Sequence, residues 1–162
     1  PLKRKRGKAM FANLVMGTLL MVINLGVQVL AVSFLINYFS KRINAEELTP
    51  SSIDEAKALS VVMAVLMLGH FFMFATWAVL LTVLGEFEDF ATAFYHSTVN
   101  FTSLGYGDIV MSEQRRLLGA LEAANGVLMF GLSAGAILSV MNGMFSRRKT
   151  AQTIKKKLKP GK

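Results

Sequence analysis

Thr102-Ser103-Leu104-Gly105-Tyr106-Gly107-Asp108 decides the fold, because this short segment lies between two long apolar segments where no soluble fold would need such a turn. Gly105 and Gly107 alternate with larger residues, so the backbone can adopt left-handed φ values at every second position. A strand that alternates in this way can direct successive carbonyl groups to one side. A row of carbonyl oxygens can replace the water around a dehydrated cation. The segment therefore indicates a backbone that is suited to binding cations.

The charged residues are segregated along the chain, and this pattern indicates a membrane protein. Only 17% of the 162 residues are charged, fewer than a soluble domain of this length carries. No Asp, Glu, Lys or Arg occurs in residues 9–40 or 58–85, and Glu122 is the only charged residue in 117–146. Each run exceeds the roughly 20 residues that cross a bilayer core as a helix. Buried helices of a soluble protein are the alternative, but three such runs leave no polar face wide enough for water.

The sequence predicts an all-α membrane protein with three long helices and one short re-entrant helix. Residues 86–89 include three acids, which suit the N-terminus of a short helix. The twelve residues 90–101 are too few to span the bilayer, and irregular backbone at membrane depth needs protein or a cavity around it. The predicted segments are a basic N-terminal tail at 1–8, a first transmembrane helix at 9–40, a polar connector at 41–57, an outer helix at 58–85, a short helix at 88–101, the glycine-containing segment at 102–108, an inner helix at 117–146 and a basic tail at 147–162.

Polar residues form a narrow stripe on the first predicted helix. Asn13, Gly17, Asn24 and Gln28 fall within about 60° of one another at helical spacing. A helix that lies in the membrane interface would show a broad face rich in Lys and Arg instead. We interpret the stripe as a seam that packs against another helix, where amides and glycine allow close approach.

The net charge of +8 is concentrated in the two tails. We expect these tails to meet anionic lipid at the cytoplasmic membrane surface, and no nucleic acid. Eight basic residues in 147–162 place that tail in the cytoplasm, so the glycine-containing segment is external and the first helix begins outside. Five basic residues in 1–8 contradict this orientation. Either the charge rule is broken here, or the first helix lies along the interface.

Ser103 to Gly107 resembles the TVGYG selectivity filter of potassium channels, and Asp108 matches the acidic residue that usually follows it. The resemblance covers roughly residues 87–145, and 93–130 are similar to small bacterial proteins called potassium channel family proteins. It implies a pore domain at 58–146 with a pore helix, a filter and an inner helix. It also implies a potassium-selective channel with K⁺ as the permeant ion and no cofactor. Because one filter strand gives one quarter of a ring, a homotetramer is expected in the cell membrane, a bacterial inner membrane by this resemblance.

The resemblance also implies which atoms bind the ion. In the family, the carbonyls of four filter residues and the hydroxyl of the first make stacked K⁺ sites. Two residues depart from the pattern: Ser103 replaces threonine and loses the methyl group that restricts χ1, and Leu104 replaces valine. The ion-binding residues carried over are Ser103, Leu104, Gly105 and Tyr106.

Residues around the filter are expected to support it. By position, Tyr95 matches an aromatic residue that bonds the aspartate after the filter in some family members, and Val99 stands where some have a glutamate. Glu122, an acid inside a membrane segment, is expected to be paired behind the filter, with Ser97 or Thr98 as partner. The predicted support residues are Thr102, Gly107, Asp108, Tyr95, Val99 and Glu122.

Gly126 and Phe130 resemble the hinge glycine of the inner helix and its aromatic neighbour. Ordinary packing through a small residue explains Gly126 equally well. The family pattern places Val127, Ala134 and Leu138 near a central cavity and Asn142 near its inner mouth.

Several functional alternatives remain at this point. His70 and His96 could sense protons, although a neutral, hydrogen-bonded histidine is the commoner case. No cluster offers a nucleophile, a base and an orienting group, so an enzyme is not expected. A non-conducting channel subunit and a weakly selective cation pore are the rival functions. The acids near the filter could concentrate cations or merely cap helices, namely Glu86, Glu88, Asp89, Asp108 and Glu113.

Overall fold

The computed structural model describes residues 2–45 and 52–158, and in these ranges the chain is helical with no β-strand. Four helices follow in order: α1 (Leu2–Ala45), α2 (Ser52–Val83), α3 (Phe90–Phe101) and α4 (Arg116–Leu158). Three of them, α1, α2 and α4, are long and apolar enough to cross a membrane. The predicted all-α membrane fold is confirmed. Residues 46–51 of the predicted connector and 159–162 of the predicted tail lie outside the described ranges.

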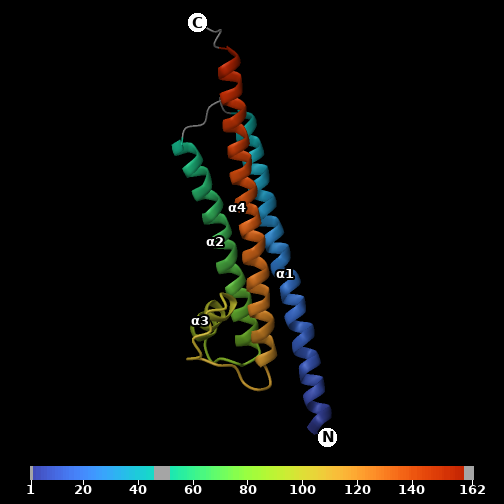
Figure 1. Cartoon of the computed structure of the whole chain (residues 1–162). Helices are drawn as coiled ribbons and strands as arrows, with labels where there is room; N and C mark the ends of the chain where they lie inside the picture. Colours follow the sequence, from blue (N-terminus) through green and yellow to red (C-terminus); the bar gives the residue numbers. More distant parts are fainter. Residues whose placement is uncertain (1, 46–51, 159–162) are drawn as a thin grey trace.

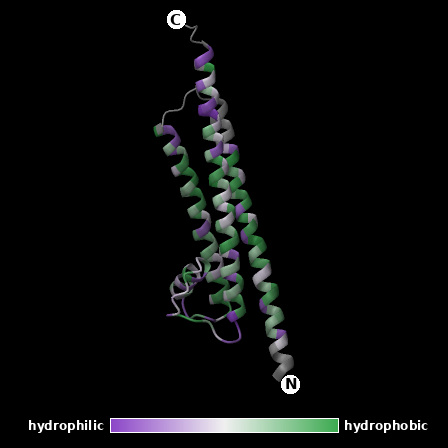
Figure 2. Ribbon diagram, viewed as in Figure 1, coloured by the Kyte–Doolittle hydropathy of each residue, from purple (hydrophilic) through white to green (hydrophobic). Residues whose placement is uncertain are grey.

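The three long helices form one bundle, with α3 and the segment after it at one end (Figure 1). The chain runs in the same direction in α1 and α4 and in the opposite direction in α2 (Figure 1). The first residues of α1 therefore lie at the same end of the bundle as α3, and the last residues of α4 lie at the other end. The three long helices are mainly hydrophobic along most of their length (Figure 2), and many of their large hydrophobic side chains are exposed, which suits a lipid environment.

The helices differ from the predicted segments at several ends. α3 begins at Phe90 rather than at residue 88, because Asp89 is extended, with φ −131° and ψ 155°, and its carboxylate accepts a hydrogen bond from Thr92 N. α2 ends at Val83 because Gly85 has a φ of 67° and the amides of Gly85 and Glu86 close the helix end. α4 does not stop at residue 146 but continues as a helix into the basic tail.

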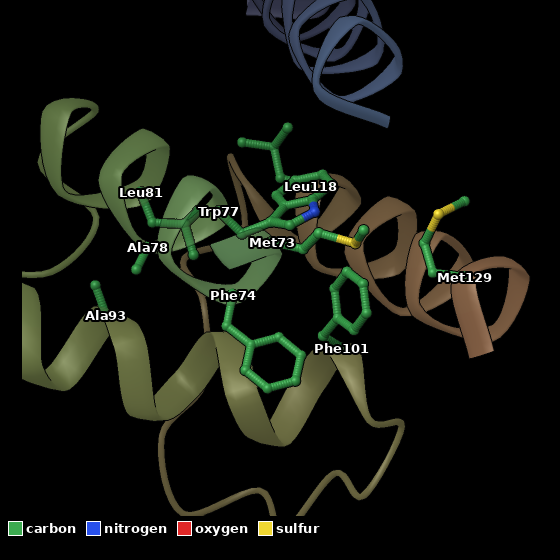
Figure 3. Packing of buried hydrophobic residues seen from close by; sticks show 9 residues of the cluster. All are labelled: Met73, Phe74, Trp77, Ala78, Leu81, Ala93, Phe101, Leu118 and Met129. Atoms are coloured by element: carbon green, nitrogen blue, oxygen red, sulfur yellow. The ribbon is translucent and has the colours of Figure 1, made fainter. Parts of the chain in front are cut away.

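The main hydrophobic core lies where α2, α3 and α4 meet. Figure 3 shows its buried side chains, with Phe74 and Phe101 edge to face at a centroid distance of 5.1 Å. Burying these aromatic and aliphatic side chains fixes α3 against the two long helices. The buried members of this core are Met73, Phe74, Trp77, Ala78, Leu81, Ala93, Phe101, Leu118 and Met129.

The polar stripe of α1 is a packing seam, as predicted. Asn24 Nδ2 donates a 2.8 Å hydrogen bond to Asn125 Oδ1 of α4, and Trp77 Nε1 of α2 donates to the same oxygen at 3.1 Å. Gln28 Nε2 donates to Ser133 Oγ of α4 at 2.8 Å. These buried amide contacts make α1 part of the bundle. α1 therefore packs along the length of α4, beside the other long helices.

Candidate functional site

The segment after α3 has the alternating backbone that its glycines predicted. Ser103, Gly105 and Gly107 have φ values of 58°, 59° and 74°, whereas Leu104 and Tyr106 have no positive φ. Ser103 is the one residue other than glycine with a positive φ in the described part of the chain. Left-handed values cost a residue with a Cβ more than they cost glycine, so the surrounding structure must hold Ser103 in this conformation.

The last turn of α3 holds the inner end of this segment. Leu104 N donates to Val99 O at 3.0 Å, and Ser103 N donates to Asn100 O at 2.9 Å. Thr102 Oγ1 donates to Thr98 O at 2.8 Å. Donors from the segment therefore satisfy the free carbonyls at the end of α3. The negative end of the α3 dipole lies beside the segment.

Tyr95 and Asp108 hold the outer end. Tyr95 Oη donates a 2.7 Å hydrogen bond to Asp108 Oδ2, and Ile109 N donates to Asp108 Oδ1 at 3.0 Å. The Tyr95 hydroxyl lowers the pKa of the Asp108 carboxyl below its ordinary value of 3.8. The structure thus brings together the pair that the resemblance implied.

A cavity of about 340 Å³ lies behind the segment. Val99 lines it together with Tyr95, Gly105, Gly107 and Asp108. Valine presents only methyl groups there, so a carboxyl group does not face Asp108 from this position, as the sequence indicated.

Glu122 is fully buried between α4 and α3. Its Oε2 accepts a 2.9 Å hydrogen bond from Asn100 Nδ2, which also donates to Gly119 O at 2.8 Å. Its location behind residues 102–108 agrees with the prediction, and Asn100 is a partner that was not predicted. Of the two predicted partners, the buried Ser97 side chain interacts with the Glu122 carboxyl, whereas the Thr98 hydroxyl donates to Phe94 O instead.

Sequence reasoning missed Asn100. An asparagine in the last turn of a largely apolar short helix was the available signal, because a buried amide needs partners. Its side chain joins the end of α3 to α4, and its backbone carbonyl accepts the bond from Ser103 N. Asn100 therefore links residues 102–108 and α3 to α4.

Gly126 is required by packing. A Cβ at this position would lie 1.8 Å from Phe101 O, the carbonyl near the end of α3. α4 continues as one helix through Gly126, so of the two readings left open, close packing is the one the geometry supports. Phe130, 38% exposed, lies against Phe101 and His70, with centroid distances of 6.0 and 4.6 Å.

The remaining predicted residues of α4 face away from the core. Val127 and Leu138 are exposed on α4, as are Ala134 and Asn142. They lie on a surface of the helix that the chain itself does not cover, which is the condition for lining a shared cavity.

The two histidines differ in their surroundings. His70 Nε2 lies 3.2 Å from Ser133 Oγ, so the hydrogen-bonded reading holds for His70. His96 is buried with Nδ1 3.9 Å from Glu122 Oε2, and that nitrogen has no hydrogen-bond partner in the described chain. The expectation of a hydrogen-bonded histidine therefore stays a prediction for His96.

Asp89 and Glu86, two more of the acids near residues 102–108, also have structural contacts. Asp89 caps α3, and the Thr92 amide lowers the pKa of its carboxyl. The Glu86 carboxylate accepts hydrogen bonds from the Ser112 amide and hydroxyl and lies 3.5 Å from Arg115 Nη1. Glu86 therefore connects the loop after residues 102–108 to the end of α2.

Comparison with known proteins gives one match. The family model described as "Ion channel" matches residues 61–142, which is just over half of the chain and includes most of α2, all of α3 and the first part of α4. No curated protein and no solved structure matches the chain.

Proposed function

Because the chain belongs to the ion channel family whose model covers residues 61–142, we propose that it forms a potassium-selective channel. In this proposal the channel conducts K⁺ passively across the membrane and has no enzymatic role. The filter is the segment Ser103 to Gly107, whose carbonyls and Ser103 hydroxyl replace the hydration shell of K⁺.

The observation that carries the proposal is the alternating backbone of the filter segment. Left-handed φ values at Ser103, Gly105 and Gly107 separate residues with negative φ, so successive peptide groups can turn their oxygens to a common side. The bond from Tyr95 to Asp108 and the bonds to the end of α3 hold this backbone in place. A preorganised row of carbonyl oxygens favours a dehydrated monovalent cation.

Four copies of the chain are needed to complete the proposed site. One chain supplies one filter strand, and its residues 102–108 are all exposed. A ring of four strands would surround the ion with carbonyls and bury this segment, so we propose a homotetramer. Val127, Ala134, Leu138 and Asn142 would then face the common cavity.

We further propose that the basic end of α4 meets anionic lipid at the inner surface of a cell membrane. α4 is helical over 43 residues, about 65 Å, whereas the hydrocarbon core is about 30 Å thick. The end of the helix must therefore leave the hydrocarbon, and Lys149, Lys156 and Lys157 are exposed there. Each basic residue near an anionic surface is attracted by about 1 kcal/mol.

Ion flux into liposomes that contain the purified chain tests the proposal. We expect uptake of K⁺ and Rb⁺ and much slower uptake of Na⁺. Equal K⁺ and Na⁺ flux would support a weakly selective pore, for which Ser103 in place of threonine gives a reason, since its χ1 is less restricted. Absence of any flux would support a non-conducting subunit.

A matched pair of glycine variants controls the flux assay. Gly105→Ala adds a Cβ where φ is 59° and should abolish flux, because alanine is strained at a left-handed φ. Gly26→Ala adds the same atom to an open position of α1 and should leave flux unchanged. Flux that survives Gly105→Ala would show that the ions do not pass through the filter segment.

A further inference from the structure

A buried acid and a buried histidine face each other where α3 packs against α4. Glu122 is 0% exposed, which is true of no other acidic residue that the structure describes. His96 is 7% exposed, and its Nδ1 lies 3.9 Å from Glu122 Oε2. This distance is too long for a hydrogen bond, and the same nitrogen has no other hydrogen-bond partner among the described residues. The two ionisable groups therefore meet without completing a hydrogen bond.

The same oxygen of Glu122 is already held from the same face of α3. His96 and Asn100 are four residues apart, so they are neighbours on the helix surface. Asn100 Nδ2 donates to Glu122 Oε2 at 2.9 Å. A protonated imidazole is positively charged and carries a donor hydrogen on both nitrogens, so it attracts a carboxylate as a neutral imidazole does not. Proton uptake by His96 therefore strengthens an existing contact between α3 and α4.

The last turn of α3 connects this contact to the filter segment. Asn100 O accepts a hydrogen bond from Ser103 N at 2.9 Å, and Val99 O accepts one from Leu104 N at 3.0 Å. Both carbonyls lie about one helical turn from His96. A small shift of α3 toward α4 therefore moves the groups that hold the inner end of the filter segment.

The surroundings of His96 allow a proton to reach the ring. His96 lines the cavity of about 340 Å³ behind the filter segment, together with exposed residues that follow this segment. Its ring also packs against Phe87, with a centroid distance of 4.9 Å. Among the described residues, only Glu122 places a carboxylate oxygen within 4.0 Å of a His96 nitrogen. The other charged groups that face the ring or its cavity are Glu86 after α2, with Arg115 paired to it, Asp108 after the filter segment, and Arg116 at the start of α4.

We propose that His96 and Glu122 form a proton-dependent contact that sets how long the filter segment stays in its conducting state. When His96 binds a proton, the imidazolium closes on Glu122 Oε2 and holds α3 against α4. When the proton leaves, this contact opens and the inner end of the filter segment is held less firmly. The inference rests on the proposed potassium channel and adds its regulation by pH.

The decay of K⁺ flux with time, compared at about pH 5.5 and about pH 7.5, measures this regulation, because histidine is the side chain whose ordinary pKa lies in that range. The chain has two histidines and no cysteine. We expect flux to decay up to about tenfold more slowly at the lower pH, since a pKa difference of one unit between two states changes their equilibrium tenfold. His96→Gln and Glu122→Gln should each remove the pH dependence. His70→Gln is the matched control and should keep it, because His70 lies beside Ser133 and not beside an acid.

A nuclear magnetic resonance titration in detergent examines the contact without relying on conduction. The ring nitrogen shifts of His96 should give a different midpoint in Glu122→Gln than in the parent chain, whereas the midpoint of His70 should stay the same. Equal midpoints for His96 would overturn the contact.

The flux outcomes separate the regulation from the channel itself. Flux decay that is the same at both pH values in the parent chain, or a pH dependence that survives in His96→Gln, would overturn the regulation and leave the channel intact. A parent chain without K⁺ flux would overturn the channel and its regulation together. The titration of His96 would in that case still decide whether the contact with Glu122 exists.

Discussion

Gly126 and Gly143 lie on the same helix but have different roles. At Gly126 the chain leaves no space for a Cβ, because Phe101 O would be 1.8 Å away, whereas at Gly143 nothing lies within 4 Å. The two glycines therefore separate the effect of packing from the effect of helix propensity.

We expect Gly126→Ala to destabilise the chain by at least about 1–3 kcal/mol, since backbone atoms of α3 must move to admit the methyl group. The measurement is the free energy of unfolding in detergent with added denaturant. Gly143→Ala should be neutral or stabilising by up to about 1 kcal/mol, because alanine favours the helix. Equal effects of the two substitutions would contradict the packing role of Gly126.

The hydrogen bond from Tyr95 to Asp108 should set how the outer end of the filter segment responds to acid. The pKa of Asp108 is lowered chiefly by this bond, so its contribution to stability is present above the ordinary value of 3.8 and is lost as pH falls through the lower folded value. In Tyr95→Phe the pKa of Asp108 should rise toward its ordinary value, so the contribution to stability should be smaller and its loss should be complete at a higher pH. Carboxyl carbon chemical shifts recorded against pH would measure the pKa of Asp108 in each protein.

Asp89 provides the internal control for this titration. Its pKa is lowered by the Thr92 amide and hydroxyl, neither of which the substitution touches. The Asp89 titration should therefore be the same in both proteins. If the pKa of Asp108 is the same in Tyr95→Phe as in the parent chain, the hydrogen bond from Tyr95 to Asp108 has no support in solution.

At the level of elements, α3 and α4 are joined by the contact between Asn100 and Glu122. Both groups are at least partly buried, and Asn100 Nδ2 also holds Gly119 O. The contact lies directly behind the residues that anchor the filter segment. Loss of this contact should shift α3 and thereby disturb the filter segment.

We expect Asn100→Ala to cost about 1–3 kcal/mol, because it removes the hydrogen bond that Asn100 donates to the buried Glu122. Glu122→Gln should retain K⁺ flux but alter the stability of the conducting state, seen as a changed decay of flux with time. Combining the two substitutions should cost less than the sum of the single effects, with a coupling of about 0.5–3 kcal/mol. Glu88→Gln, at an exposed acid, is the control and should change neither property.

Additive effects of Asn100→Ala and Glu122→Gln would show that the two side chains act independently. Unchanged conduction and unchanged flux decay in Glu122→Gln would show that the acid has no role in holding the filter.

On the scale of the whole molecule, the position of α1 bears on the conflict between the two basic tails. It packs lengthwise on α4, and its first residues lie at the same end as α3 (Figure 1). Asn13 Nδ2 also donates to Gln114 O, in the loop just before α4 begins. A spanning α1 therefore places the basic residues of 1–8 on the same side of the membrane as the filter segment, against the charge rule.

This arrangement predicts which residues are accessible from the same side of the membrane. The chain has no cysteine, so single cysteines can be labelled without background. Gly7→Cys and Glu88→Cys should react with a membrane-impermeant maleimide from one side, and Thr150→Cys only from the other. Reaction of Gly7→Cys from the side of Thr150 would contradict a spanning α1 in this orientation.

Much of the site could be predicted from the sequence, because the signals were local. Gly105 and Gly107 predicted the alternating backbone, since glycine adopts left-handed φ without strain. The twelve-residue length of α3 and the acid at Asp89 predicted the short helix, although its first residue was placed two positions early. The contact of Glu122 with Asn100 and the contact of Gly126 could not be predicted in this way, because both depend on how closely α3 and α4 approach.

The sequence alone determined that three helices of this protein are long and apolar enough to cross a membrane and that a glycine-containing segment lies between two of them, since charge-free length and glycine spacing act within one stretch of chain. Only the tertiary structure decided what the buried polar groups contact. Asn24 meets Asn125 across 101 positions, and Gln28 meets Ser133 across 105. A buried amide requires a partner but does not specify one. The identity of that partner follows from the packing of whole helices, which no local pattern records.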